Sequence, residues 1–171
     1  MKFCEKCGKP LTLKECGLEG KVAYCNSCKE FKFPTFNSAI SAIVFNPTKD
    51  KVLLIQQYGR KDNILVAGYI NQGENSKEAL IREIKEEIDL EVVSFTYNDN
   101  EYFKPTNTLI HNYAVTVDRD DFKLTNEVDY ASWYDIEEVL KVIKPNSLAK
   151  SFVERYLSKD HEYVNDRVII D

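Results

Sequence analysis

Acidic side chains are crowded onto one short helix that directly follows a glycine-containing turn. The turn runs from Gly68 to Glu74, and the predicted helix after it carries Glu83, Glu86 and Glu87. At about 100° per residue, these three glutamates share one arc of the helix. Like charges four residues apart cost a helix about 0.2–0.5 kcal/mol per pair. The crowding therefore favours a fold that places a cation among these acids.

The same helix has a defined start and an apolar side. Asn75 with Glu78 three residues later is typical of a capping box. Next to the acidic arc lies an apolar arc at helical spacing, made of Leu80, Ile81, Ile84 and Ile88. A helix with this pattern packs its apolar arc on a core, which holds the neighbouring acids in place.

A hard divalent cation suits such a cluster, because carboxylate oxygens are its preferred ligands. Such a cation also makes water a nucleophile at neutral pH. Arg82 adjoins the acids and can hold one of them by a charge-assisted hydrogen bond. Gly68 lets the backbone come close enough for its carbonyl to reach the metal. On composition alone, a solvated glutamate-rich helix face is the alternative.

The full spacing is Gly-x5-Glu-x7-Arg-Glu-Ile-x-Glu-Glu-x-Asp-Leu, counted from Gly68 to Leu90. It resembles the Nudix box. Two positions of that box require an aliphatic residue, and Ile84 and Leu90 fill them here. The one departure is Asp89, where the family has glycine. Asp tolerates a helix-ending conformation better than most residues. The resemblance extends over most of the chain from Pro34 onward.

The resemblance implies a fold, a reaction and a set of residues. It implies an α/β (α+β) fold of the Nudix type, an α/β/α sandwich with a mixed sheet. It implies a pyrophosphohydrolase that uses Mg²⁺ or Mn²⁺ to cleave a nucleoside diphosphate linked to another moiety. The residues that match the family's ligands and supports are Glu83, Glu86 and Glu87 with the Gly68 carbonyl, and Glu74 with Arg82.

A further acid stands late in the chain. The stretch from Glu127 to Tyr134 resembles a strand found late in many family members, an acid followed by a Trp-aromatic pair. Glu127 is therefore predicted to be a further ligand or the general base. The family often has a second Glu where this chain has Tyr130, so the base assignment stays open, and a plain loop acid is the alternative. Trp133 and Tyr134 favour core positions over a nucleobase platform.

Two Cys-x-x-Cys pairs, Cys4 with Cys7 and Cys25 with Cys28, stand seventeen residues apart. This spacing is typical of a structural zinc site, in which four thiolates close a tetrahedron. About thirty residues cannot bury a sufficient core alone, so the metal would supply folding energy. A redox role would need a βαβ context that this segment lacks. Cys16 is left over as a free thiol.

A zinc ribbon before a Nudix domain resembles the NADH pyrophosphatase branch, whose members split NADH and in some cases remove NAD caps from RNA. That branch carries a Ser-Gln-Pro-Trp-x-Phe-Pro-x-Ser signature, where this chain has residues 98–108 without a match. The substrate therefore stays open among NADH, ADP-ribose and nucleotide sugars. The oligomeric state stays open between a monomer and a homodimer, although the resembled branch is often dimeric.

The rest of the chain predicts one ordinary domain with a small appendage. A boundary near Pro34 gives a zinc ribbon at 1–33 and a hydrolase domain at 34–171. Predicted strands at 39–45, 52–57, 65–69, 91–95, 109–117 and 131–134 alternate with helices that start near residues 76, 135 and 146. This pattern favours a layered architecture.

Composition limits the class of protein. The net charge is −5, and no apolar run is long enough to span a bilayer. The N-terminus lacks the apolar region of a signal peptide, which predicts a cytoplasmic protein with reduced thiols. Two alternatives to an enzyme remain: a nucleotide-binding module, and an adaptor whose lysine-rich first segment contacts RNA.

Overall fold

The computed structural model describes residues 2–159 of the chain. The stretch 160–171 of the predicted hydrolase domain and Met1 of the predicted ribbon lie outside the described residues. The chain divides into two compact units, Met1–Phe36 and Asn37–Asp171. Residues 33–36, where the predicted boundary falls, carry no helix or strand. Each unit is therefore described by itself.

The smaller unit is a three-stranded antiparallel sheet in the order β1-β2-β3. Its strands are β1 (Thr12–Glu15), β2 (Lys21–Cys25) and β3 (Glu30–Lys32), with a single 3₁₀ turn η1 (Gly17–Glu19) between the first two. Among the described residues of this unit, only Cys4 and Cys25 are buried. So small an apolar core cannot by itself offset the entropy of folding.

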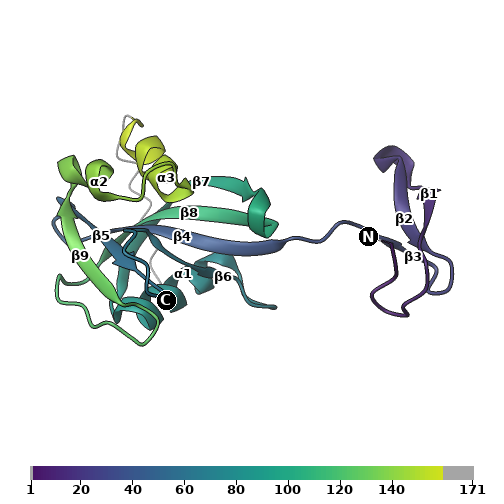
Figure 1. The fold of residues 1–171 in the computed structure, drawn as a ribbon, viewed down its shortest axis with the longest axis horizontal. Coiled ribbons are helices and arrows are strands. Elements are labelled where there is room, and N and C mark those ends of the chain that lie inside the picture. Colours follow the sequence, from purple (N-terminus) through teal and green to yellow (C-terminus); the bar gives the residue numbers. More distant parts are fainter. Residues whose placement is uncertain (1, 160–171) are drawn as a thin grey trace. The chain divides into compact units, whose positions relative to one another are not determined.

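The larger unit is built on a six-stranded mixed sheet (Figure 1). Five strands run in the order β7-β8-β4-β5-β9, and β6 also pairs with β4. The β4–β8 pair is parallel and the other pairs are antiparallel. The strands are β4 (Asn37–Phe45), β5 (Lys51–Gln56), β6 (Val66–Tyr69), β7 (Val92–Phe103), β8 (Thr108–Val117) and β9 (Tyr130–Asp135).

Helices cover both faces of this sheet (Figure 1). Helix α1 (Ser76–Ile88) packs on one face, where Leu80 and Ile84 join a core with Ile40 and Val66. Helices α2 (Ile136–Val142) and α3 (Leu148–Leu157) cover the other face, in a second core that includes Phe152. The predicted α/β/α layering with a mixed sheet is confirmed.

Strand β7 is much longer than the sequence predicts, because it continues from residue 95 to Phe103. Asn and Asp residues have low strand propensity, so the sequence gives no strand signal here. Pairing with β8 nevertheless extends along the whole segment, with register shifts between Val92 and Ser94 and between Tyr97 and Asp99. The 3₁₀ turn η2 (Lys104–Thr106) then leads into β8. The segment 98–108 is therefore an ordered hairpin.

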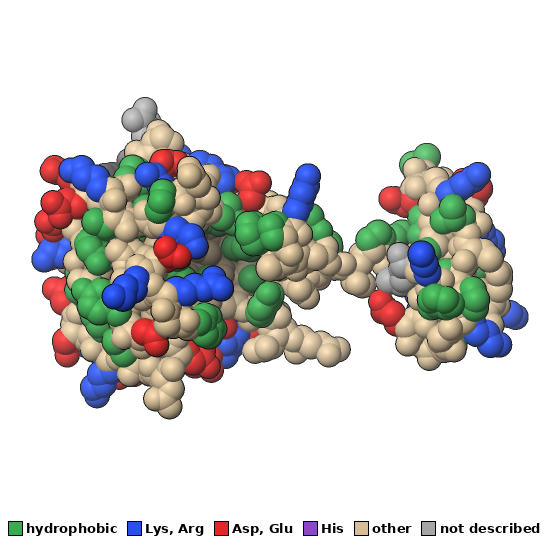
Figure 2. Space-filling model, viewed as in Figure 1, with side chains coloured by type: hydrophobic (Ala, Val, Ile, Leu, Met, Phe, Trp, Pro, Cys, Tyr) green, Lys and Arg blue, Asp and Glu red, His purple; other side chains and the backbone are tan. Residues whose placement is uncertain are grey.

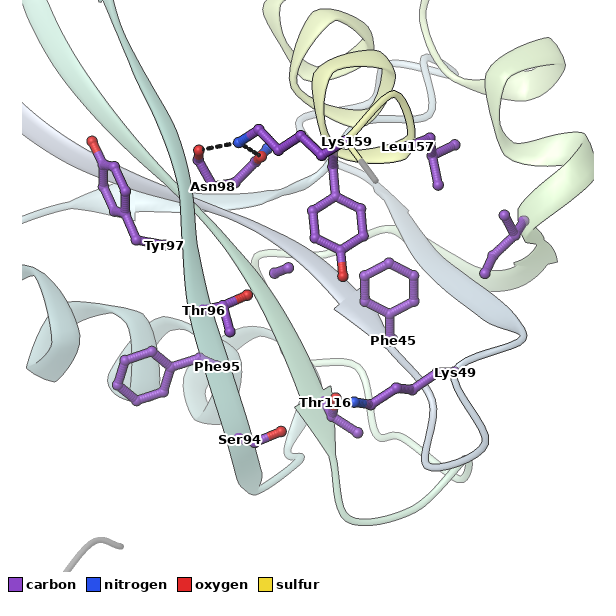
Figure 3. A pocket seen from close by; sticks show the side chains of 13 residues that line it. Phe45, Lys49, Ser94, Phe95, Thr96, Tyr97, Asn98, Thr116, Leu157 and Lys159 are labelled. Atoms are coloured by element: carbon purple, nitrogen blue, oxygen red, sulfur yellow. Dashed lines mark hydrogen bonds between the residues drawn. The ribbon is translucent and has the colours of Figure 1, made fainter. Parts of the chain in front are cut away.

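A cavity of about 420 Å³ opens on the α3 side of the sheet (Figure 3). Ser94, Thr96 and Thr116 of β7 and β8 line it, together with Phe45. At one end Lys159 Nζ donates to Asn98 Oδ1 at 2.8 Å. Because Phe45 belongs to the core under α2 and α3, this cavity belongs to that layer and not to the layer of α1.

Acidic and basic side chains are interspersed over the visible face of the larger unit (Figure 2). Among residues 2–159, no helix has the length and apolarity needed to cross a membrane.

Candidate functional site

Helix α1 begins at a complete capping box. Asn75 Oδ1 accepts hydrogen bonds from the N–H groups of Lys77 and Glu78, both at 3.0 Å, and the Glu78 carboxylate accepts from the Asn75 N–H at 2.9 Å. The helix ends at Asp89, which takes a left-handed conformation with φ 53°. Both ends of the acidic helix are thereby fixed by its own sequence.

The Glu83 carboxylate lies directly against the backbone of Gly68 on strand β6. A Cβ atom added at Gly68 would come within 1.9 Å of both Cδ and Oε1 of Glu83. Glycine is therefore required here to admit the carboxylate. Burial raises the pKa of Glu83, although Arg82 opposes that effect. The structure thus brings together two residues that the sequence places fifteen positions apart.

Glu87 is 2% exposed and only half satisfied. Its Oε1 accepts a hydrogen bond from Gln57 Nε2 at 2.7 Å, whereas its buried Oε2 has no partner among the described residues. Burial raises the pKa of Glu87 to about 8, and the nearby charges of Glu83 and Glu127 add to the rise. A buried carboxylate oxygen without a partner is costly, and a bound cation would remove that cost.

Arg82 connects the acids of the turn and the helix. Its Nε and Nη2 atoms donate to the two carboxylate oxygens of Glu74 at 2.7 and 2.9 Å, and Nη2 also donates to the Tyr69 carbonyl. Its Nη1 donates to Glu83 and Glu86, both at 2.8 Å. These bonds hold the pKa of Glu74 down at about 2. Arg82 and Glu74 therefore form a rigid bidentate pair beside the helix.

Glu127 lies in the turn before β9 and is exposed. It is close enough to Glu83 and Glu87 for its charge to raise the pKa of both. Glu86 on α1 is also accessible to solvent, because 57% of its side-chain surface is exposed. Two buried carboxylates, those of Glu83 and Glu87, therefore lie near two exposed ones, those of Glu86 and Glu127.

Sequence reasoning missed Gln57. This residue is buried directly after β5 and, within residues 2–159, is the one side chain that donates to Glu87. The sequence marks it only as the last polar residue of an apolar strand, which gives no signal of a role beside an acid thirty positions later. Its contact depends on how β5 lies under α1.

These residues fit a divalent cation. The unpartnered Glu87 oxygen and the close approach of Glu83 to a glycine backbone supply hard oxygen donors in a confined space. As it stands, one oxygen of Glu83 and one oxygen of Glu86 both accept from Arg82 Nη1 at 2.8 Å, so the guanidinium lies between these two carboxylates. A cation would compete with Arg82 for these two carboxylates while Glu74 keeps the guanidinium in place.

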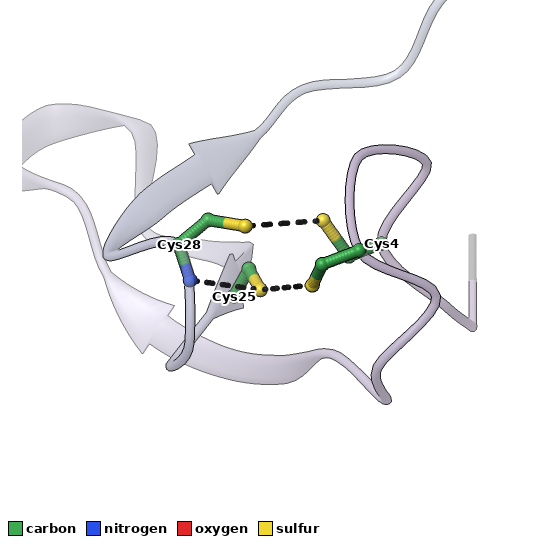
Figure 4. A group of neighbouring side chains, drawn as sticks. Cys4, Cys25 and Cys28 are labelled. Atoms are coloured by element: carbon green, nitrogen blue, oxygen red, sulfur yellow. Dashed lines mark hydrogen bonds between the residues drawn. The ribbon is translucent and has the colours of Figure 1, made fainter.

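Four cysteine thiols converge in the smaller unit (Figure 4). The sulfur atoms of Cys4, Cys7, Cys25 and Cys28 all lie within 4.8 Å of one another, the one such group of metal-ligating side chains found in residues 2–159. The Cys4–Cys28 and Cys7–Cys25 sulfur pairs are 3.9 and 3.6 Å apart. Tetrahedral zinc with bonds of about 2.3 Å needs sulfur pairs about 3.8 Å apart, so the thiols fit this ion.

A local hydrogen bond helps to prepare one thiol. The Cys28 N–H donates to Cys25 Sγ at 3.4 Å and lowers the pKa of Cys25 to about 6, which favours the thiolate that a metal needs. Cys16 stays outside the group.

Comparison with solved structures shows the same fold elsewhere. A NUDIX hydrolase from Nitrosomonas europaea superimposes with a TM-score of 0.70 at 20% identity, over 94% of this chain and 93% of that one. At this identity the likeness shows the fold alone.

The curated relatives that match this chain are longer than it is. The NAD-capped RNA hydrolase NudC of Pseudomonas entomophila is 24% identical over 161 residues, which is 92% of this chain and 56% of that protein. The NAD-capped RNA hydrolase ndx-9 of Caenorhabditis elegans is 26% identical over 146 residues, 82% of this chain and 38% of that protein. This chain spans about half the length of NudC. The NUDIX domain model matches residues 35–156, so the chain belongs to the NUDIX domain family.

Proposed function

We propose that this chain is a divalent-cation-dependent pyrophosphohydrolase acting on a nucleoside diphosphate linked to another moiety. One observation carries the proposal: the Glu83 carboxylate lies in a space that only a glycine at position 68 leaves open, near a buried Glu87 oxygen that has no partner within residues 2–159. An ordinary solvated helix face would have neither feature. The family and the named relatives support the same reaction class.

The proposed ligands are Glu83, Glu86 and Glu87, with the Gly68 carbonyl as an addition. Mg²⁺ or Mn²⁺, when bound, would offset charge on the diphosphate and make water more acidic. Arg82, held by Glu74, keeps Glu83 and Glu86 at the end of the helix and limits the rotamers that they can adopt. Gln57 fixes one Glu87 oxygen so that the other points away from it.

Glu127 is the proposed general base. It is exposed while its neighbours Glu83 and Glu87 are buried, so it can accept a proton from water and release it to solvent. Water then adds to one phosphorus, the bridging P–O bond breaks, and two phosphomonoesters leave. The acids that hold the cation do not need to change protonation in this scheme.

The test uses Glu86→Gln and Glu87→Gln in the full-length chain. Both are expected to abolish turnover while the protein stays folded, because each removes a ligand charge and keeps the side chain's shape. Glu154→Gln on α3, an exposed Glu of the other helical layer, is the matched control and should keep full activity. Near-normal activity in both site variants would refute the proposal.

A substrate panel addresses the second half of the proposal. NADH, ADP-ribose, nucleotide sugars and dinucleoside polyphosphates would be incubated with Mg²⁺ or Mn²⁺, and products identified by mass. The names of the relatives make an NAD-type dinucleotide the first candidate. Tight binding of ADP-ribose with no cleavage of any panel member would instead favour a nucleotide-binding module.

RNA carrying an NAD cap is the second candidate substrate, and the charge of the smaller unit favours it. Residues 1–36 contain seven lysines and four glutamates, whereas the rest of the chain contains 16 basic and 24 acidic residues. A basic unit would add affinity for the RNA chain behind the cap. This added affinity would fall steeply as the salt concentration rises. The test compares kcat/KM for NAD-capped RNA and free NAD at low and high salt; equal values at low salt would contradict this role.

The same proposal includes a structural zinc ion, a homodimer and a cytoplasmic location. Zinc would be held by Cys4, Cys7, Cys25 and Cys28, whose sulfur spacing suits it. Metal analysis of the purified protein and light scattering test the first two, and cell fractionation tests the third.

A further inference from the structure

The loop between β5 and β6 is anchored beside the acidic cluster. At its start, Gln57 donates to Glu87 at 2.7 Å. The Gly59 N–H donates to Asp129 Oδ2 at 2.7 Å, two residues after Glu127. At its far end, the Asn63 carbonyl accepts from the Lys144 N–H at 2.8 Å. The loop is therefore tied at both ends, with its first half fastened to residues next to the proposed ligands and base.

Tyr58 occupies a costly conformation within this loop. Its φ is +58°, in the left-handed region that favours glycine, and Gly59 follows with φ +69°. The Tyr58 side chain nevertheless stands 79% exposed, so no burial of its ring offsets the strain. Strain of this kind persists where surrounding bonds impose it, and it is concentrated at functional sites. Here the two positive φ values occur in a tight turn that the Arg60 N–H closes by donating to the Gln57 carbonyl at 3.2 Å, and the bonds of Gln57 to Glu87 and of Gly59 to Asp129 hold this turn beside the acids.

Arg60 follows directly and differs from the other described arginines. Arg82, Arg119 and Arg155 all form ion pairs with carboxylates. Arg60 is exposed and forms no ion pair within residues 2–159, although Asp62 stands in the same loop and Asp129 accepts from the Gly59 N–H. A guanidinium without an ion pair in residues 2–159, two positions after an exposed tyrosine, is a combination suited to a phosphate and a planar group on one ligand.

We propose that Tyr58 and Arg60 hold the substrate of this site, with the Arg60 guanidinium on a phosphate and the Tyr58 ring stacked on a planar heteroaromatic ring. The inference rests on the proposed function and extends it to residues outside the acidic helix. A diphosphate is repelled by the carboxylates around it, and Arg60 adds a cation that pairs with no acid of residues 2–159. The anchored loop keeps both groups in place before the substrate arrives, which lowers the entropy cost of binding.

Four variants of the full-length chain test this role by separating KM from kcat. Tyr58→Ala is expected to raise KM by about 5- to 100-fold, the range for loss of one stacked base, with kcat little changed, while Tyr58→Phe keeps the wild-type KM. Arg60→Ala is expected to lower kcat/KM by about 10- to 100-fold, as for a lost hydrogen bond to a charged group, and Arg60→Lys to recover part of it. Wild-type KM in both alanine variants would overturn the proposal.

A glycine variant guards against a purely structural explanation. Tyr58→Gly should relieve the left-handed strain and raise the melting temperature while it weakens binding. Lys49→Gly is the matched control, because Lys49 also has a positive φ of 59° but lies in the turn between β4 and β5. It should raise the melting temperature with an unchanged KM. Equal KM values for the two glycine variants would show that Tyr58 does not touch the substrate.

Binding measured without turnover separates this proposal from the function on which it rests. The affinity for ADP-ribose would be measured by calorimetry in the inactive Glu86→Gln background, with and without Tyr58→Ala. If Glu86→Gln remains active, the proposed function fails; if it is inactive and Tyr58→Ala leaves affinity unchanged, only the present inference fails. Comparing ADP-ribose with NADH also identifies the ring: equal losses indicate adenine, and a loss confined to NADH indicates nicotinamide.

Discussion

Replacing Gly68 with alanine is expected to displace the Glu83 carboxylate while leaving the fold intact. The new Cβ would lie 1.9 Å from Cδ and Oε1 of Glu83, whereas real Cβ contacts stay above 3.0 Å, so the carboxylate must withdraw by about 1.1 Å. A misplacement of about 1 Å in an active site can cost about 10²-fold in rate, or about 2.7 kcal/mol of barrier. We therefore expect a kcat about a hundredfold lower.

Stability should change little in this variant. Gly68 does not have a left-handed backbone conformation, so alanine fits its backbone without strain. The loss of backbone freedom in the unfolded chain stabilises the folded state by about 0.4–1 kcal/mol, which offsets part of the cost of moving a side chain. The melting temperature is thus the internal control for a change confined to the site.

The assay measures kcat at saturating Mg²⁺ and the affinity for Mn²⁺ by calorimetry. Adding Glu83→Asp to the Gly68→Ala variant shortens the displaced side chain by one methylene, so the combined loss should be smaller than the sum of the two single losses. Gly20→Ala, at φ +69° with no atom within 4 Å, should lower stability of the smaller unit and leave kcat unchanged. A Gly68→Ala enzyme within twofold of wild type would refute the reasoning.

Three further outcomes follow from the geometry. Burial raises the pKa of Glu87 from 4.5 to about 8, so the chelator-treated protein should lose stability as pH rises from 4.5 through 8, and Glu87→Gln should remove most of that loss. Urea unfolding followed by fluorescence of Trp133, the single tryptophan, checks this in the larger unit alone. Cys25→Ser should abolish zinc binding and expose residues 1–36 to protease, with Trp133 fluorescence unchanged; retained zinc would contradict the four-thiol site. Asn75→Ala removes the capping box of α1 and should lower the free energy of unfolding by about 1 kcal/mol, read as a lower urea midpoint.

The acidic helix could be predicted in detail because its signals are local. The cap at Asn75, the apolar arc and the spacing of Glu83, Glu86 and Glu87 all lie within one stretch of chain, and helix formation depends on such neighbours. The cysteine pairs are likewise informative by spacing alone, because four thiolates at this separation suit one kind of closed metal site. The layered α/β class follows from alternating strand and helix periods.

Only the tertiary structure decides how these parts meet. The contact of Gln57 with Glu87 and the approach of Glu83 to Gly68 join residues on different strands and a helix, and no local pattern encodes such distances. Strand β7 continues through Asn98 and Glu101 because its ladder with β8 overrides weak strand propensity. The sequence by itself determines which groups can bind a cation or zinc. Packing determines which carboxylate keeps an oxygen that no other described residue pairs with, and therefore where a cation is most needed.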